Sequence, residues 1–339
     1  MILYVGNYIS KHGTTPTFNE FLSDKLGETY KVYKSSDQKN KYLRMIAMCW
    51  SVFKYSHKVK VVMVDSFSTQ AFWFAFGVAL MCRINRIPYV PIIRGGMFEE
   101  RLKRNPRISR WILKNSAANL SPSHFMEDIL KSKGFSVTYI PNYLDVDNYE
   151  FLKRDKFELK LLWVRSLHEV YNPVLAVDIL HTLKQKYKDV SLCMIGPDKD
   201  GSKKQIEDQA IKLNVLDSIT LTGKMNKDEW RLQSKNYDIF INTTNVDNQP
   251  LTVTEAMALG LPVISTAIGG NKYFIREGEN GFLVPVGDKD AFVEKIEYIL
   301  NNQEKVKTIC QNARHDAEQF EWEKVKPLYD KLFAGILKK

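Results

Sequence analysis

The residues around Pro250 could bind a phosphate group at the start of a helix. Proline suits the first position of a helix, and the run Gly260-Leu261-Pro262 supplies a stop, so we expect a short helix over residues 250–259. The amides of Leu251 and Thr252 would then lack partners within the helix. Such unpaired N–H donors, together with the positive end of the helix dipole, favour a phosphate.

Two acids accompany this helix, and each has a functional and a structural explanation. Glu255 offers a planar acceptor with two oxygens, which suits the vicinal diol of a ribose. An acid in the first turns of a helix also simply offsets the helix dipole. Asp247 and Asn248 could contact a ligand or form an ordinary turn. A second set of free amides, expected where Gly269-Gly270-Asn271 opens another helix, favours the ligand-binding interpretation.

Arg165 is the third candidate, because it closes a predicted strand in the run Trp163-Val164-Arg165. A cation at the carboxyl end of a strand lies where a pyrophosphate would bind, and a guanidinium can bind phosphate oxygens through two parallel hydrogen bonds. A lone arginine more often forms a surface ion pair. With two amide-presenting helix starts expected nearby, we interpret Arg165 as a phosphate ligand.

Short apolar runs with strand character alternate with helical segments along the whole chain, which is typical of βαβ units around parallel sheets. The fold class is therefore α/β, with two doubly wound domains in series and a ligand crevice expected between them at the carboxyl ends of the strands. The predicted strands cover residues 2–5, 59–64, 89–93, 118–120, 137–140, 159–164, 190–195, 219–221, 237–241, 262–265 and 281–284.

The boundary between the domains is expected near residue 150. Residues 1–150 are predicted to form an N-terminal, acceptor-binding domain, and residues 151–319 a C-terminal, nucleotide-binding domain. Residues 320–339 have helical spacing and are expected to pack back onto the first domain.

The composition is that of an ordinary globular chain, with 44% hydrophobic and 26% charged residues among 339. The four cysteines are far apart and lack a C-x-x-C spacing, so neither a zinc site nor a disulfide framework is indicated, and a cytoplasmic setting is expected. The first residues resemble a buried strand rather than a signal peptide. The longest apolar run, residues 71–82, is about eight residues short of a membrane-spanning helix and is expected to be a core helix.

The net charge of +10 is concentrated in the first half of the chain. Residues 1–150 hold 21 Lys and Arg against 12 Asp and Glu, a balance of +9, whereas residues 151–339 hold 28 against 27, a balance of +1. This asymmetry indicates an anionic partner for the first half, such as nucleic acid, an acidic membrane surface or a phosphorylated substrate. No nucleic-acid-reading motif accompanies the charge, so we expect no nucleic acid partner.

Two predicted helices carry much of this charge. Residues 39–60 interleave basic side chains with apolar and aromatic ones, and the helix that begins at Asn105-Pro106 places Arg107, Arg110 and Lys114 on one face. Basic residues beside exposed aromatics suit an anionic bilayer surface. A core helix with a solvated, charged rim explains the same pattern equally well.

The motifs of the second half resemble those of the retaining glycosyltransferases of family 4. The signature of that family has two acids eight positions apart, in Glu-Gly-Phe-Pro, four residues and Glu-Ala-Met-Ala-x-Gly-x-Pro-Val, followed by Gly-Gly and Asn-Gly-x-Leu-Val. This chain has Asp247-Asn-Gln-Pro and Glu255-Ala-Met-Ala-Leu-Gly-Leu-Pro-Val, then Gly269-Gly270 and Asn280-Gly-Phe-Leu-Val. The resemblance implies the GT-B fold of two facing Rossmann-like domains, with a C-terminal helix that crosses back.

The resemblance also implies a role for each matched residue. Glu255 would bind the ribose of a nucleotide-sugar donor, and Arg165 its diphosphate. Asp247 would meet the transferred sugar as a catalytic residue. The predicted donor-binding residues also include Asn172, Asn248, Gln249, Pro250, Leu251 and Thr252.

The chain departs from the family pattern at three points. The first acid is Asp247 rather than Glu, which is one methylene shorter and could change the sugar hydroxyl that it meets. The lysine that follows the family's arginine is absent, so part of the phosphate charge must be met elsewhere. In the first domain Arg94 stands where the family has a histidine, and we predict that it is a second catalytic residue.

A loop of the first domain is a further candidate. His12, Gly13 and Thr14 follow the first predicted strand, where they could contact the donor or the acceptor. A flexible, solvated loop explains these residues equally well.

Asp-x-Asp triplets at residues 145–147, 198–200 and 288–290 could hold a divalent metal in another glycosyltransferase fold. Loop or helix-cap chemistry explains each of them here, so we expect no metal and no other cofactor.

The resulting hypothesis is a retaining, metal-independent hexosyltransferase that moves a sugar from a nucleotide-sugar donor to a saccharide or lipid-linked saccharide in cell-envelope polysaccharide synthesis. It would act in the cytoplasm, peripherally on the inner face of the membrane. The alternatives are a nucleotide-sugar epimerase on the same fold and a non-catalytic, glycosyltransferase-like partner in a membrane assembly.

Overall fold

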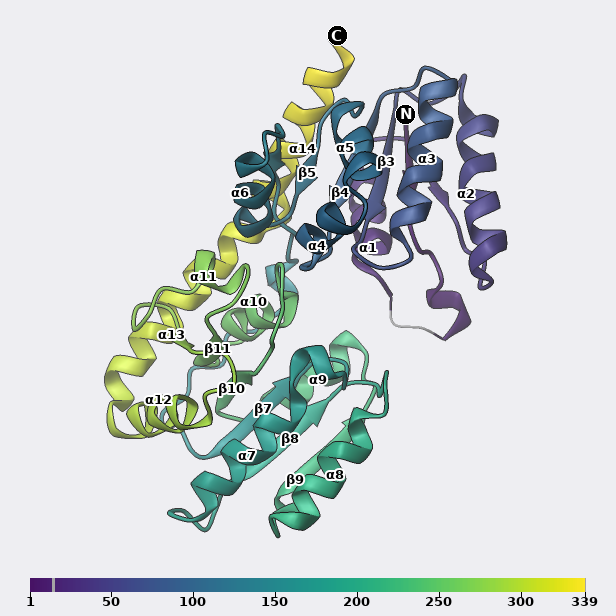
Figure 1. The fold of residues 1–339 in the computed structure, drawn as a ribbon. Helices are drawn as coiled ribbons and strands as arrows, with labels where there is room; N and C mark the ends of the chain where they lie inside the picture. Colours follow the sequence, from purple (N-terminus) through teal and green to yellow (C-terminus); the bar gives the residue numbers. More distant parts are fainter. Residues whose placement is uncertain (14–15, 339) are drawn as a thin grey trace. The chain divides into compact units, whose positions relative to one another are not determined.

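The structure of this chain is a computed structural model that describes residues 1–13 and 16–338, and it divides into two units (Figure 1). The first unit comprises residues 1–143 and 323–339, and the second comprises residues 144–322. The division predicted at residue 150 lies a few residues later in the chain.

The first unit is built on a six-stranded parallel sheet in the order β2-β1-β3-β4-β5-β6. Its order changes direction between β1 and β3, as in doubly wound folds with a switch point there. Its elements are β1 (Ile2–Val5), η1 (Ser10–His12), α1 (Phe18–Gly27), β2 (Val32–Ser35), α2 (Lys41–Tyr55), β3 (Val61–Ser66), α3 (Phe72–Ile84), β4 (Tyr89–Ile93), α4 (Phe98–Arg104), α5 (Pro106–Lys114), β5 (Leu120–Ser121), α6 (His124–Ser132), β6 (Thr138–Tyr139) and the part of α14 (Trp322–Leu337) that follows Trp322.

The second unit has its own six-stranded parallel sheet, in the order β12-β11-β10-β7-β8-β9. This is the doubly wound order whose switch point lies between the first and fourth strands along the chain, here β7 and β10. Its elements are η2 (Val146–Asn148), β7 (Lys160–Val164), η3 (Glu169–Tyr171), α7 (Pro173–Lys184), β8 (Ser191–Ile195), α8 (Ser202–Lys212), η4 (Leu216–Ser218), β9 (Ile219–Gly223), α9 (Lys227–Ser234), β10 (Ile239–Asn242), α10 (Leu251–Ala258), β11 (Val263–Thr266), α11 (Asn271–Phe274), β12 (Phe282–Val284), α12 (Lys289–Asn301), α13 (Gln303–Ala317) and η5 (Glu318–Phe320).

The strands are apolar on both faces because helices cover both faces of each sheet. In β7, Leu161 and Trp163 belong to one hydrophobic cluster of the second unit, whereas Leu162 and Val164 belong to another. Successive side chains of a strand point to opposite faces, so these clusters lie on the two sides of the sheet.

The predicted α/β fold with parallel sheets is confirmed, and every predicted strand overlaps an observed one. One strand, β2, was not predicted. It pairs only with β1 at the edge of its sheet, and Lys34 in its middle is exposed, so it lacks the apolar run of a buried strand. The helix predicted over residues 250–259 is α10, although Pro250 precedes its first residue as the N-cap.

Candidate functional site

Two of the candidate residues lie at the switch point of the second unit. Arg165 follows β7 directly, and Asp247 lies in the loop between β10 and α10. In open α/β sheets, ligands bind outside the carboxyl ends of the strands at such a point, because the connecting loops there diverge to opposite faces of the sheet. The fold therefore places both residues where a ligand is expected.

Arg165 and Asp247 form a buried ion pair. Nη2 of Arg165 donates to Oδ2 of Asp247, and the guanidinium carbon lies 4.2 Å from the centre of the Tyr171 ring. Burial alone would lower the pKa of Arg165, but the nearby carboxylate of Asp247 outweighs burial and raises it. Burial raises the pKa of Asp247, and Arg165 opposes that shift. Glu255 lies on α10, which begins a few residues after Asp247, so the fold places all three predicted residues at this switch point.

A pair of glycines lets the Asp247 loop pass close to the start of α11. A Cβ atom built on Gly269 would lie 1.8 Å from the carbonyl oxygen of Asp247, and one on Gly270 would lie 1.7 Å from that of Asn248. Gly269 also has a φ of +53°, in the left-handed region. The amide of Gly270 donates to the carbonyl of Asp247 at 3.3 Å. The Gly-Gly pair is thus required by close backbone approach, and it holds the loop that carries Asp247.

We expect Gly270→Ala to destabilise the protein by about 2–3 kcal/mol, because the added methyl group must displace the backbone of the Asp247 loop. Thermal unfolding would measure the loss, expected as a decrease of roughly 5–10 °C in Tm. Gly335→Ala is the control, since Gly335 lies in α14 with nothing within 4 Å of an added Cβ atom. An unchanged Tm for Gly270→Ala would contradict this role of the glycine.

The start of α10 carries buried polar atoms that the protein does not satisfy. No side chain in the described part of the chain caps this helix at Pro250. The hydroxyl of Thr252 and Nε of Arg165 are buried, and neither has a hydrogen-bond partner among the described residues. Unsatisfied buried donors are rare because they cost free energy, so they mark a place where ligand oxygens would be stabilising. The predicted residues Asn248, Gln249 and Leu251 belong to the same segment, and the amide of Asn248 donates to Oδ1 of Asp247 at 2.9 Å.

Glu255 is only 2% exposed and is held by two residues that the sequence analysis did not identify. The hydroxyl of Tyr149 donates to Oε1 of Glu255 at 2.6 Å, and Nζ of Lys227 lies 3.0 Å from the same oxygen. Burial and the Glu255 carboxylate raise the pKa of Tyr149, so its hydroxyl stays protonated and can donate. Among the described residues no hydrogen bond reaches Oε2 of Glu255, which leaves that oxygen available to a ligand.

Lys227 is the first residue of α9, where the helix dipole disfavours a cation. This unfavourable position of a cation is the local sequence signal that Lys227 has a partner outside its own helix. Tyr149 offers no such signal, because it is separated from Glu255 by 106 positions.

Asn172 lies beside the switch point but its side chain already has a partner. It adopts a left-handed conformation with a φ of 47°, and its Nδ2 donates to Oδ1 of Asn245 at 3.4 Å. The hydroxyl of Thr243, just after β10, donates to the carbonyls of Tyr171 and Asn172 at 3.0 and 2.8 Å. The loop that lacks the family's lysine is therefore anchored to the end of β10.

Arg94 lies in the first unit within a buried polar cluster at the carboxyl ends of β1, β3 and β4. Its guanidinium donates to Asp65 at 2.6 Å, to Asn142 at 2.8 Å and to Tyr4 at 2.9 Å. Burial alone would lower the pKa of Arg94, but Asp65 and Tyr4 raise it, and burial raises the pKa of Asp65 despite the charge of Arg94. These contacts position Arg94 firmly, and its catalytic role stays a prediction.

The first-unit loop is described only in part. His12 is exposed at the end of η1, and its Nε2 lies 2.9 Å from the carbonyl oxygen of Asp37. Gly13 follows with a φ of +80°. Thr14, the third residue of that prediction, lies outside the described residues.

Two of the three Asp-x-Asp triplets, at residues 198–200 and 288–290, serve a turn and a helix start, as predicted. Oδ1 of Asp198 accepts from the amide of Gly201 at 3.0 Å, and Oδ1 of Asp288 caps α12 by accepting from the amide of Ala291 at 3.0 Å. Across residues 1–13 and 16–338, no group of three or more His, Cys, Asp or Glu side chains is arranged to hold a metal ion.

Solved structures with the same fold include HepE of Anabaena in complex with UDP. Its TM-score is 0.79 with 18% identity, over 98% of this chain and 99% of that one. The fold is GT-B, which confirms the predicted class.

The sequence of residues 148–316 matches the family model of glycosyl transferases group 1. An uncharacterized glycosyltransferase of Methanocaldococcus jannaschii is 30% identical over 133 residues, 38% of each chain. The capsular polysaccharide biosynthesis glycosyltransferase CapM of Staphylococcus aureus is 34% identical over 100 residues, 28% of this chain and 26% of that protein. The chain thus matches well under half the length of these relatives.

No helix among the described residues combines the length and apolar character needed to cross a bilayer.

Proposed function

We propose that this protein is a retaining glycosyltransferase that transfers a hexose from a nucleotide-sugar donor to a saccharide or lipid-linked saccharide acceptor. The observation that carries the proposal is the set of unsatisfied or available polar atoms at one switch point: Nε of Arg165, the hydroxyl of Thr252 and Oε2 of Glu255. Cationic and N–H donors beside a two-oxygen acceptor suit a diphosphate joined to a ribose. The UDP and UDP-glucose bound by HepE are consistent with such a donor.

In the proposed reaction, the bond between the anomeric carbon and the diphosphate oxygen breaks, and its electron pair stays on the leaving diphosphate. The oxygen of an acceptor hydroxyl forms the new bond on the same face of the sugar, and the proton of that hydroxyl passes to the leaving diphosphate. Arg165 and the amides at the start of α10 would stabilise the charge that develops on the leaving diphosphate. Glu255 would hold the ribose, and Asp247 would contact the sugar. This scheme uses the chain's own cations for the leaving group and needs no metal ion.

The first unit is proposed to bind the acceptor. Its excess of basic residues would suit an anionic, lipid-linked saccharide at the cytoplasmic face of a membrane. The name of the relative CapM, in capsular polysaccharide biosynthesis, is consistent with a role in cell-envelope polysaccharide synthesis.

The proposal is tested by thermal unfolding in the presence of UDP-, GDP-, ADP- and dTDP-linked sugars. We expect one nucleotide class to raise the Tm by stabilising the folded state, by about 2.7 kcal/mol at a hundredfold excess over its Kd. Release of the matching nucleoside diphosphate on adding acceptor would then establish transfer. If no nucleotide sugar raises the Tm, the donor site is refuted, and turnover of donor without acceptor would indicate an epimerase instead.

A further inference from the structure

Helix α2 has a second apolar face that the protein does not bury. Met48, Ser51 and Val52 face the core of the first unit. The opposite side presents large apolar side chains at helical spacing, which are 53–69% exposed: Tyr42, Leu43, Ile46, Trp50 and Phe53. A surface helix ordinarily carries charged or polar residues on that side. A contiguous exposed patch of this kind marks an interaction site.

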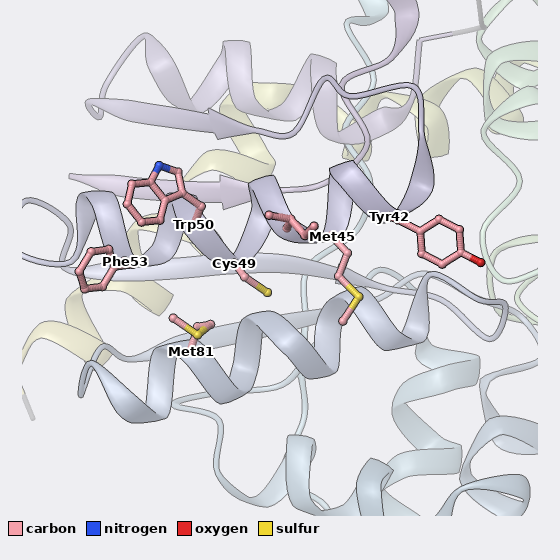
Figure 2. Close-up of a pocket in the computed structure, with 7 residues that line it drawn as sticks. Tyr42, Met45, Cys49, Trp50, Phe53 and Met81 are labelled. Carbon is pink, nitrogen blue, oxygen red and sulfur yellow. The ribbon is translucent and has the colours of Figure 1, made fainter.

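The neighbouring helix α3 extends this patch. The two helices lie side by side, with side chains of both directed toward the space between them (Figure 2). The groove there has a volume of about 620 Å³ and is lined by Tyr42, Met45, Ile46, Cys49, Trp50, Phe53 and Met81. Gly77 of α3 lets the helices approach, because a Cβ atom there would lie 3.1 Å from Met45 and 3.2 Å from Cys49. Leu80 and Ile84 of α3 are also exposed, by 42% and 65%. We call these exposed residues of the two helices the α2–α3 surface.

Positive charge is concentrated at the ends of the two helices that form the α2–α3 surface. Residues 38–98 contain nine Lys and Arg but only one acid, Asp65, and that acid is buried against Arg94. The exposed basic residues of this segment form no ion pair with any described carboxylate: Lys39, Lys41, Lys54, Lys58, Lys60, Arg83 and Arg86. The surface is therefore apolar along the two helices and cationic at their ends.

Helix α5, the other basic helix predicted from the sequence, differs in this respect. Arg107, Arg110 and Lys114 are exposed, but Trp111 and Ile112 on its other side pack into the core of the first unit. Helix α5 is thus an ordinary amphipathic helix with a solvated rim, and it exposes no apolar face.

We propose that the α2–α3 surface inserts into the interface of an anionic membrane. Exposed Trp, Tyr, Phe and Ile residues suit the boundary between headgroups and acyl chains, and the lysines at the helix ends suit anionic headgroups. A second copy of the chain would oppose like charges at the ends of the same patch, so charge complementarity favours lipid over self-association. Membrane binding by this surface rests on the proposed function only in that it would bring the enzyme to a lipid-linked acceptor. The observations that support membrane binding do not depend on the donor site.

The test is binding of the full chain to vesicles of phosphatidylcholine mixed with phosphatidylglycerol, compared with phosphatidylcholine alone, by flotation. We expect the anionic vesicles to be preferred. The variant Ile46→Ser/Trp50→Ser/Phe53→Ser should reduce their binding about 100-fold through lost apolar insertion. The variant Lys54→Glu/Lys58→Glu/Lys60→Glu should reduce it by a similar factor at low salt, since each lysine contributes about 1 kcal/mol at an anionic surface.

Two matched controls test whether any exposed apolar side chains, or any basic residues of the first unit, would have the same effect on vesicle binding. Ile211→Ser/Leu232→Ser removes side chains of the second unit that are 62% and 68% exposed, and should leave vesicle binding unchanged. Reversal of Arg107, Arg110 and Lys114 changes three charges of the same unit away from the apolar patch and should have a much smaller effect. An equal loss in that variant would overturn the proposal.

Two further results would also overturn it. One is vesicle binding that is unchanged in both α2–α3 variants, and the other is a dimer in solution that the apolar variant dissociates. The Tm of each variant, and its increase on adding donor, report whether the fold and the donor site are intact. A wild-type protein that binds vesicles but no nucleotide sugar would refute the proposed function and leave the membrane surface standing.

Discussion

Glu255→Ala should weaken binding of the nucleotide-sugar donor about 10- to 100-fold, which corresponds to the roughly 1.5–3 kcal/mol of a hydrogen bond to a charged group. The reason is that Glu255 is buried, is fixed by Tyr149 and Lys227 through one oxygen, and keeps its other oxygen for a ribose hydroxyl. Such an acceptor is pre-oriented, so little side-chain entropy is lost on binding. Isothermal titration with the donor identified by the thermal screen would measure the change in Kd.

Two variants define how the Glu255 result is interpreted. Tyr149→Phe removes one hydrogen bond that orients Glu255 while keeping the ring, so its effect on Kd should be smaller, about 2- to 10-fold. Glu279→Ala removes an exposed acid that pairs with Arg276 in the same unit and should leave Kd unchanged. Donor binding by Glu255→Ala at the wild-type Kd, in a protein that unfolds cooperatively, would eliminate the ribose role.

Arg165→Ala should lower kcat about 10²- to 10³-fold, the size of effect seen when one group that stabilises transition-state charge is removed. The guanidinium lies at the carboxyl end of β7, beside the start of α10, where the proposed leaving diphosphate gains charge. Arg165→Lys keeps the charge but loses the planar, two-pronged donor, so it should recover only part of the rate. Arg276→Ala, a side chain about half exposed in the same unit, is the control and should keep the wild-type kcat.

The same variant has an expected dependence on pH. Burial already raises the pKa of Asp247 in the folded protein, and Arg165 opposes that shift. Removing Arg165 should raise this pKa further, so the folded state holds its proton more tightly than the unfolded chain does. The protonated Asp247 carboxyl group therefore favours the folded state at pH values below its unfolded pKa of about 4. This contribution to stability is lost as the pH rises through the pKa of Asp247 in the folded protein. Arg165→Ala should therefore lose less Tm near pH 4 than near pH 7, and a loss independent of pH would exclude this coupling.

Much of the fold could be predicted because parallel strands covered on both faces are continuous apolar runs. Strands such as β1 and β4 were located to the residue for this reason. Strand β2 was missed because an edge strand with one neighbour needs no such run. The start of α10 was placed within one residue because proline chemistry acts locally.

The residues of the candidate site could be predicted only where they lie close together in the sequence. Asp247, Glu255 and the amides of α10 form one short stretch of chain, and the Gly-Gly pair is recognisable as a place of close backbone approach. That Tyr149 and Lys227 contact Glu255 could not be inferred, since these contacts depend on the packing of η2 and α9 against α10. The exposed face of α2 was equally undetermined, because its pattern allowed either a buried or a membrane-facing helix.

The sequence by itself therefore determined the alternating α/β order, the helix start at Pro250 and the chemical types available for binding, all of which depend on neighbours a few positions away. Tertiary structure alone decided that Arg165 pairs with Asp247, that Glu255 is buried under Tyr149 and Lys227, and that α2 leaves its aromatic face exposed. These features depend on which segments the sheets bring together. Such long-range proximity is set by burying the apolar faces of all the helices and strands at once, and no local pattern encodes it.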